Sequence, residues 1–342
     1  MVIVLFALLF SCATAQPDQS LGDIAPEEGL ISGDMYPEAE YLTAVGSGDT
    51  RRAAEEDAVG NLARIFGSEV AVDTRIVDTY RSLAADDTEY TEREMELVDN
   101  IHVQARQELI NVRFSEPVSD PSGLVSIIAY LNRDETGSIY ADLIRANNKR
   151  IESFRESAES ADSLMTAYAR LNAAHVIAVV NERLGGQLQI IAPEMISPSG
   201  ASLEDIERER QSLQSEMVFR VDVEGDDDGQ IAAFIGEGIS RLGFSTADDG
   251  LLAVQGSLQL TMSSGRYETV IWNIVLNIVN EAGSIIATVE ETNREQAAEA
   301  NMARMLALRT VKTVVDTDLM SQLFANLTDQ RLNSTGEVLG DG

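Results

Sequence analysis

The fold is decided by residues 251–290, which read LLAVQGSLQLTMSSGRYETVIWNIVLNIVNEAGSIIATVE. Apolar and polar residues alternate along three runs, so each run is predicted to be a strand with one buried face. The buried faces carry Val254, Gly256, Leu258, Leu260 and Met262, then Val270, Trp272, Ile274, Leu276 and Ile278, then Ile285, Ala287 and Val289. Residues 263–266 and 280–283 are typical of hairpin turns. We therefore expect three antiparallel strands with Trp272 in the core.

The flanking sequence adds helices to this sheet. We expect a strand at 217–223, an acidic loop at 224–229, a helix at 231–242 and a short strand from Phe244. A long helix is predicted at 294–327, with an apolar stripe through Ala303, Leu306, Ala307, Thr310 and Val314. The order β-α-β-β-β-α predicts a sheet with helices packed on one side, an α+β domain at 217–329. Residues 330–342 are predicted to be a disordered tail.

The first half of the chain predicts a second small α+β domain, at 36–184. Residues 41–45 read as a strand, 46–48 as a tight turn, and Asp49 or Thr50 as the cap of a helix ending at Gly67. We further expect a strand at 69–80, a helix at 91–108, paired strands at 109–117 and 122–132, and one long helix at 134–184. Gly185, Gly186, Pro193 and Pro198 predict a domain boundary, so 185–216 is interpreted as a linker with a short helix from Ser202 to Glu216.

The N-terminus predicts export. Residues 1–10 are wholly apolar, and ten residues rise only about 15 Å as a helix, half of a hydrocarbon core. This run therefore fits a secretory signal rather than a membrane span. We interpret residues 1–11 as a lipoprotein-type signal peptide that is cleaved after Ser11, with Cys12 lipidated. Three alternatives stay open: cleavage after Ala15, a buried N-terminal strand, and a start upstream, because the first basic residue is Arg51.

Residues 12–35 are interpreted as an acylated cysteine followed by a flexible tether. Residues 13–35 contain Pro17, Pro26 and five acidic residues, and they show no apolar periodicity. Two or more acyl chains such as palmitate on Cys12 would hold the chain stably on a membrane. The predicted location is the bacterial cell envelope, anchored to the outer membrane, with the folded part periplasmic or exposed at the surface.

The composition excludes several classes of protein. Lys and Arg total 25 against 57 Asp and Glu, a formal net charge of −32, which argues against nucleic-acid binding. A single cysteine cannot form an intrachain disulfide, and no cysteine cluster is present to hold zinc. His102 and His175 are the only histidines, and both are interpreted as packing or surface residues.

Three patterns resemble chemical motifs without completing them. Residues 46–48 read Gly-Ser-Gly, but the third glycine of a dinucleotide loop is replaced by Arg51, and the helix opens with Asp49. Residues 224–229 resemble the first half of a calcium loop, but Ile235 stands where the bidentate acid belongs. Carboxylate pairs such as Glu290 and Glu291 are expected by chance among 57 acids. No catalytic, cofactor-binding or metal-ligating residue is therefore predicted, and the chain is not expected to be an enzyme.

Residues 36–48, YPEAEYLTAVGSG, followed by Ala53, Ala54, Ala58 and Ala63, resemble the opening of the LPP-twenty lipoprotein domain. Residues 137–140, after the turn at 132–134, resemble the second half of that domain, so the resemblance covers about residues 36–165. The domain at 217–329 resembles the TolB N-terminal, FlgT and curli-secretion modules in element order only. The resemblance implies an exported bacterial lipoprotein, sometimes tied to flagellar or outer-membrane assembly, and it implies no catalytic residue.

The leading hypothesis is a non-enzymatic, membrane-tethered lipoprotein that binds other envelope proteins or copies of itself. The alternative is a soluble periplasmic or secreted protein that carries a small ligand or cation in a cleft between the domains. A third hypothesis is a hydrolase that uses paired carboxylates. A deep cavity with convergent polar groups would favour the second and third hypotheses.

Overall fold

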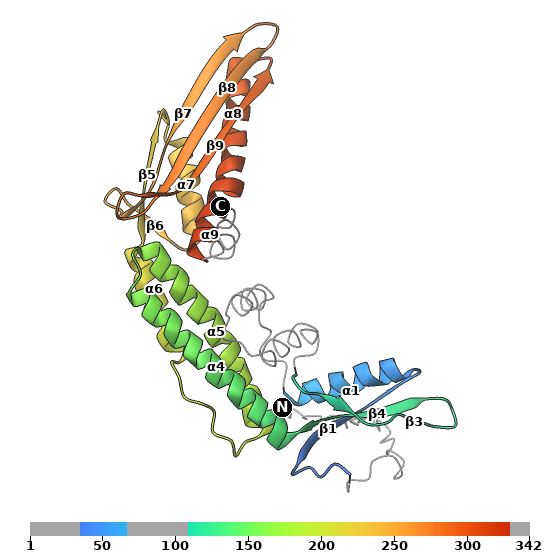
Figure 1. Cartoon of the computed structure of the whole chain (residues 1–342). Helices are drawn as coiled ribbons and strands as arrows, with labels where there is room; N and C mark the ends of the chain where they lie inside the picture. Colours follow the sequence, from blue (N-terminus) through green and yellow to red (C-terminus); the bar gives the residue numbers. More distant parts are fainter. Residues whose placement is uncertain (1–34, 67–108, 329–342) are drawn as a thin grey trace, which may run out of the picture.

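A computed structural model describes residues 35–66 and 109–328 of the chain. This part is elongated, with a sheet-and-helix unit at each end and a helical hairpin between them (Figure 1). The predicted α+β class is confirmed, because two separate sheets are combined with helices. The predicted signal peptide, tether and tail, the strand at 69–80 and the helix at 91–108 lie outside the described residues.

The N-terminal unit is a small antiparallel sheet covered by one helix. Strand β1 (Tyr41–Gly48) pairs along its whole length with β4 (Val125–Asn132), which also pairs with the short strands β2 (Arg113–Phe114) and β3 (Val118–Ser119). Helix α1 (Arg51–Ile65) begins after Thr50, whose side chain accepts a hydrogen bond from the Ala53 amide. Thr50, one of the two residues predicted as the cap, is therefore the helix cap. Its side chain satisfies an amide that would otherwise lack a partner.

The turn predicted at residues 46–48 is wrong, because these residues continue β1. Gly46 is buried beneath α1, and a Cβ atom there would lie 2.0 Å from the Ala58 nitrogen and 2.4 Å from the Ala54 oxygen. Glycine is therefore required for the close approach of strand and helix rather than for a bend.

The single helix predicted at 134–184 is also wrong, because two antiparallel helices form a hairpin. Helix α4 (Arg133–Glu159) and helix α5 (Leu164–Ile191) are separated at residues 160–163. The Ser163 side chain accepts from the Thr166 amide and starts the second helix. Between the helices, buried Asn147 donates to the Asn181 side chain at 3.0 Å. Such a polar pair in an apolar interface fixes how two helices are aligned.

Helix α5 continues past Gly185 and Gly186, where the predicted helix ended. Leu188 and Ile191, in the turns that follow, are fully buried in the core shared with α1 and α4. Their burial outweighs a glycine penalty of about 1 kcal/mol per residue. Helix α6 (Leu203–Glu216) follows, capped by Ser202 as predicted, and it lies against α5.

The C-terminal unit is a five-stranded sheet with the order β6-β5-β7-β8-β9. Its elements are β5 (Val218–Glu224), helix α7 (Gln230–Arg241), β6 (Ser245–Thr246), β7 (Leu252–Ser264), β8 (Glu268–Val279) and β9 (Ile285–Ala297). Strands β7, β8 and β9 form the predicted antiparallel hairpins, and Trp272 is fully buried as predicted. Helix α7 and helix α8 (Ala300–Val314) cover one face of the sheet (Figure 1).

The predicted helix at 294–327 starts too early. Strand β9 continues to Ala297, and α8 is followed by a π-helical turn (Val315–Leu319) and by α9 (Met320–Leu327). A hydrogen bond from α8 stabilises the C-terminal part of β9, because the Thr310 hydroxyl donates to the Glu295 carboxylate at 2.8 Å. Two residues of the predicted buried faces are exposed at strand ends, Met262 by 54% and Ile285 by 61%.

Strand β9 runs from the helical hairpin towards the far end of the molecule. It begins just after the turn at residues 280–283, where the Glu281 carboxylate accepts from the Leu164 amide at the start of α5. It ends where α8 begins, at the tip of the C-terminal unit (Figure 1). Within residues 35–66 and 109–328, no helix is both long and apolar enough to cross a bilayer.

Candidate functional site

The start of α5 is built into the core of the C-terminal unit. Met165 and Tyr168 are buried there, and the Tyr168 ring packs edge-on against Phe244 with centroids 5.3 Å apart. Phe244 in turn packs edge-on against Phe219 of β5, at 5.7 Å. The helical hairpin and the C-terminal sheet are therefore joined by a packed apolar junction rather than by a loose linker.

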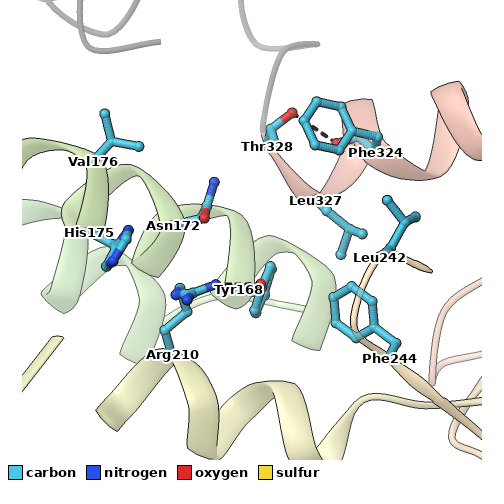
Figure 2. Close-up of a pocket in the computed structure, with 10 residues that line it drawn as sticks. All are labelled: Tyr168, Asn172, His175, Val176, Arg210, Leu242, Phe244, Phe324, Leu327 and Thr328. Atoms are coloured by element: carbon cyan, nitrogen blue, oxygen red, sulfur yellow. Dashed lines mark hydrogen bonds between the residues drawn. The ribbon is translucent and has the colours of Figure 1, made fainter. Parts of the chain in front are cut away.

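A cavity of about 310 Å³ opens beside this junction (Figure 2). This volume is at the lower end of the range for small-molecule pockets, roughly 300–1,000 Å³. Four parts of the chain line it: α5, α6, the segment after α7, and the end of α9. The lining residues are Tyr168, Asn172, His175, Val176, Arg210, Leu242, Phe244, Phe324, Leu327 and Thr328.

Arg210 is the cation of this pocket. Its Nη1 donates to the Tyr168 hydroxyl at 2.9 Å, and its guanidinium carbon lies 6.0 Å from the centre of that ring. Its Nε is buried and has no hydrogen-bond partner. No carboxylate forms an ion pair with Arg210 in the part of the chain that the structure describes. Its charge is therefore not neutralised by a neighbouring carboxylate of the described residues.

His175 lies one helical turn from Asn172 and projects beside Arg210 (Figure 2). Burial lowers the pKa of His175 below its usual value, and the positive charge of Arg210 lowers it further, whereas Glu207 opposes the shift. The imidazole is therefore neutral at neutral pH, and it presents one donor and one acceptor.

The described part of the pocket holds no nucleophile–base pair and no metal-binding cluster. Within the described residues, His175 makes no hydrogen bond to a carboxylate or to a hydroxyl that it would activate. A nucleophile–base pair requires such contact. The same described residues contain no group of three or more His, Cys, Asp or Glu side chains placed to hold a metal ion. Arg210 and the surrounding apolar side chains instead suit a small organic anion.

The other candidates from the sequence lie elsewhere. In the acidic loop, Asp226 accepts from the Ala232 amide at the start of α7, and Asp228 pairs with Arg304 at 2.7 Å. These two carboxylates stabilise the surrounding fold. Glu290 and Glu291 are exposed on β9. Ser11, Cys12 and His102 lie outside the described residues, so the predicted lipidation site stays a prediction.

Comparisons with known proteins place the chain in no named family. No protein-family model and no curated protein matches it. A solved structure of the secreted protein HP1454 from Helicobacter pylori aligns with a TM-score of 0.41 and 13% identity, covering 87% of this chain and 98% of that one.

Two further solved structures align over about a third of this chain. A minor lipoprotein from Acinetobacter baumannii has a TM-score of 0.24 and 12% identity, covering 34% of this chain and 95% of its own. The rare lipoprotein B from Shewanella oneidensis has a TM-score of 0.22 and 9% identity, covering 34% of this chain and 98% of its own. All three are secreted proteins or lipoproteins by name, but TM-scores and identities this low carry no argument about function.

Proposed function

We propose that this chain is a non-enzymatic, exported bacterial lipoprotein, anchored through Cys12 to the outer membrane, that binds envelope proteins or copies of itself. The apolar run at residues 1–10, with Cys12 close behind it, supports the anchor. The resemblance of residues 36–48 to the LPP-twenty domain supports the family as part of the same proposal. The observation that carries the interaction role is the separation of the two sheets by a long helical hairpin.

Helix α5 sets that separation. It has 28 residues, a length of about 42 Å. At its C-terminal end, Arg133 Nη1 donates to the carbonyls of Ile190 and Ile191 at 3.0 and 2.7 Å, and Arg133 Nε donates to the Glu38 carbonyl at 3.0 Å. At its other end, α5 is buried in the C-terminal core. A tether that enters before Glu38 would therefore present the C-terminal sheet far from the membrane.

The presented sheet has one uncovered face. Helices α7 and α8 pack on the other face. Among the described residues, the uncovered face of β8 and β9 carries Ile271 and Val275 together with polar side chains that pair across the strands. Asn273 donates to Thr292 at 2.7 Å, Thr288 donates to Asn277 at 2.7 Å, and Gln296 donates to Thr269 at 3.1 Å. A free strand edge beside this mainly polar face suits contact with another protein.

The test compares the full-length wild type with Cys12→Ser in a bacterial host. Intact mass and detergent partitioning are measured, with Thr14→Ser as a matched change that keeps the cysteine. We expect wild type and Thr14→Ser to carry acyl chains and enter the detergent phase, and Cys12→Ser to stay aqueous. If the wild type stays aqueous and begins at Gln16, the anchor is wrong and a soluble periplasmic protein replaces it.

The pocket at the junction favours a second candidate function, the transport of a small ligand. We propose that Arg210 binds the charged group of an organic anion whose apolar part lies against Phe244 and Leu327. Octanoate binding is measured by calorimetry on wild type, Arg210→Gln and the exposed control Arg208→Gln. We expect binding to be lost only in Arg210→Gln. Equal binding by all three proteins, or none by the wild type, would reject this candidate.

A further inference from the structure

Within the described residues, the outer edge of the C-terminal sheet is a long strand without a neighbour on one side. Strand β9 is last in the sheet order and has 13 residues. Its register with β8 shifts only near its start, opposite Ile278 and Val279, so it is regular from Ala287 to Ala297. Peptide groups along the free side of such an edge are available to another strand.

Residues 287–297 of β9 protect the edge only through charged side chains, Glu290, Glu291, Arg294 and Glu295. Proteins commonly block edges with proline, lysine or a bulge, and residues 287–297 contain none of these. Glu290 and Arg294 are both exposed on the uncovered face, four residues apart. Among the described residues, Arg294 forms no ion pair, although acidic residues outnumber basic ones by 57 to 25 in the whole chain.

We infer that β9 pairs with β9 of a second copy, antiparallel and centred on Thr292. In this register, Glu290 of each copy faces Arg294 of the other, so two opposite-charge pairs form across the axis. Glu291 faces Asn293, and no like charges face each other directly. This inference rests on the proposed function, and it names a second copy of the chain as the partner.

The neighbouring registers are unfavourable. Centring the pair on Glu291 places Glu291 of one copy directly opposite Glu291 of the other. Centring it on Asn293 places Glu291 opposite Glu295. Like charges directly opposite one another destabilise an antiparallel pair. The charge pattern therefore selects the register centred on Thr292, which would join two five-stranded sheets into one.

The first test is a disulfide across the axis, in full-length chain that carries Cys12→Ser. Opposite residues of an antiparallel pair have Cα atoms about 4.5–5.5 Å apart, within the range for a disulfide. Thr292→Cys is therefore expected to give a covalent dimer on mild oxidation. Thr288→Cys is the control, because Thr288 lies on the same face and also bonds an asparagine, but its two copies would be about 27 Å apart. Equal cross-linking of the two variants would overturn the inference.

The second test exchanges the charges. Arg294→Glu places glutamates opposite each other. We therefore expect the dimer dissociation constant, measured by sedimentation, to rise at least about tenfold. The double variant Glu290→Arg/Arg294→Glu restores opposite charges and is expected to pair like the wild type. A wild type that is monomeric at about 100 μM, or a double variant as weak as the single one, would overturn the inference.

These outcomes are separate from those of the proposed function. A wild type that is acylated and enters detergent, but does not pair through β9, keeps the anchor and loses only this inference. Each copy carries a net charge of −32, which opposes pairing. Association is therefore expected to be weaker at low ionic strength than at about 0.15 M, where the repulsion is screened beyond about 8 Å.

Discussion

Replacing Tyr168 with alanine is expected to destabilise the C-terminal unit, although Tyr168 belongs to the helical hairpin. The side chain is only 6% exposed, and its ring packs on Phe244 within the C-terminal core. Its hydroxyl also accepts the hydrogen bond from Arg210. Removing the ring therefore leaves a cavity between α5 and the sheet, and it deprives Arg210 of its partner.

The size of the effect follows from these contacts. Truncating a buried aromatic residue to alanine costs about 3–5 kcal/mol in free energy of unfolding. Tyr168→Phe keeps the ring and removes only the hydroxyl, so its expected cost is about 1 kcal/mol. The difference between the two variants measures how much the ring stabilises the junction.

Trp272 provides the assay. It is the only tryptophan and is fully buried in the C-terminal core, so its fluorescence reports the unfolding of that unit. In urea, we expect Tyr168→Ala to lower the midpoint by at least about 1 M, and Tyr168→Phe to lower it less. Tyr140→Ala is the control, since Tyr140 is also buried but belongs to the other core. An unchanged midpoint in Tyr168→Ala, or an equal shift in Tyr140→Ala, would refute the reasoning.

Three further changes test other parts of the fold. Gly46→Ala is expected to destabilise the N-terminal unit by about 3 kcal/mol or more, because backbone atoms of α1 occupy the space that a Cβ atom would need. Gly60 lies at an open helical position, so Gly60→Ala is expected to stabilise the same unit by about 0.5–1 kcal/mol. Circular dichroism during urea unfolding compares the two. The lowered pKa of His175 means that the folded chain binds fewer protons than the unfolded chain, so stability present above about pH 6.5 is lost as the pH falls through the folded pKa. This loss of stability is expected to be smaller in His175→Gln, as measured by urea unfolding at several pH values. Equal pH profiles of stability for the wild type and His175→Gln would contradict the prediction. Arg133→Ala is expected to speed amide exchange at the C-terminal end of α5, while exchange near Ser163 stays unchanged.

The sequence predicted best what local periodicity determines. The hairpins of β7, β8 and β9 follow from alternation sustained over many residues, and the start of α6 follows from Ser202 at its cap. The break at residues 160–163 was missed because helix-forming residues stand on both sides and only Ser163 marks the new start. Gly185 and Gly186 were misinterpreted because the burial of the following turns is a tertiary effect.

The pocket was beyond prediction for a related reason. Its lining residues lie between positions 168 and 328, and they meet only because the start of α5 enters the C-terminal core. Arg210 lies in a polar helix with one other arginine, Arg208, and nothing in its local sequence distinguishes it. His175 was interpreted as a packing or surface residue, yet it lines the pocket. Contacts between distant segments decide such sites, and one sequence does not reveal them.

The direction of β9 decides how paired copies would be oriented on a membrane. The strand points away from the N-terminal unit of β1, β4 and α1, along the length of the molecule (Figure 1). In the inferred antiparallel pair, the two N-terminal units therefore lie at opposite ends, and so would the anchors proposed at Cys12. Such a pair would not stand upright with both anchors beneath it. It would lie flat along a single bilayer, or bridge two bilayers that face each other.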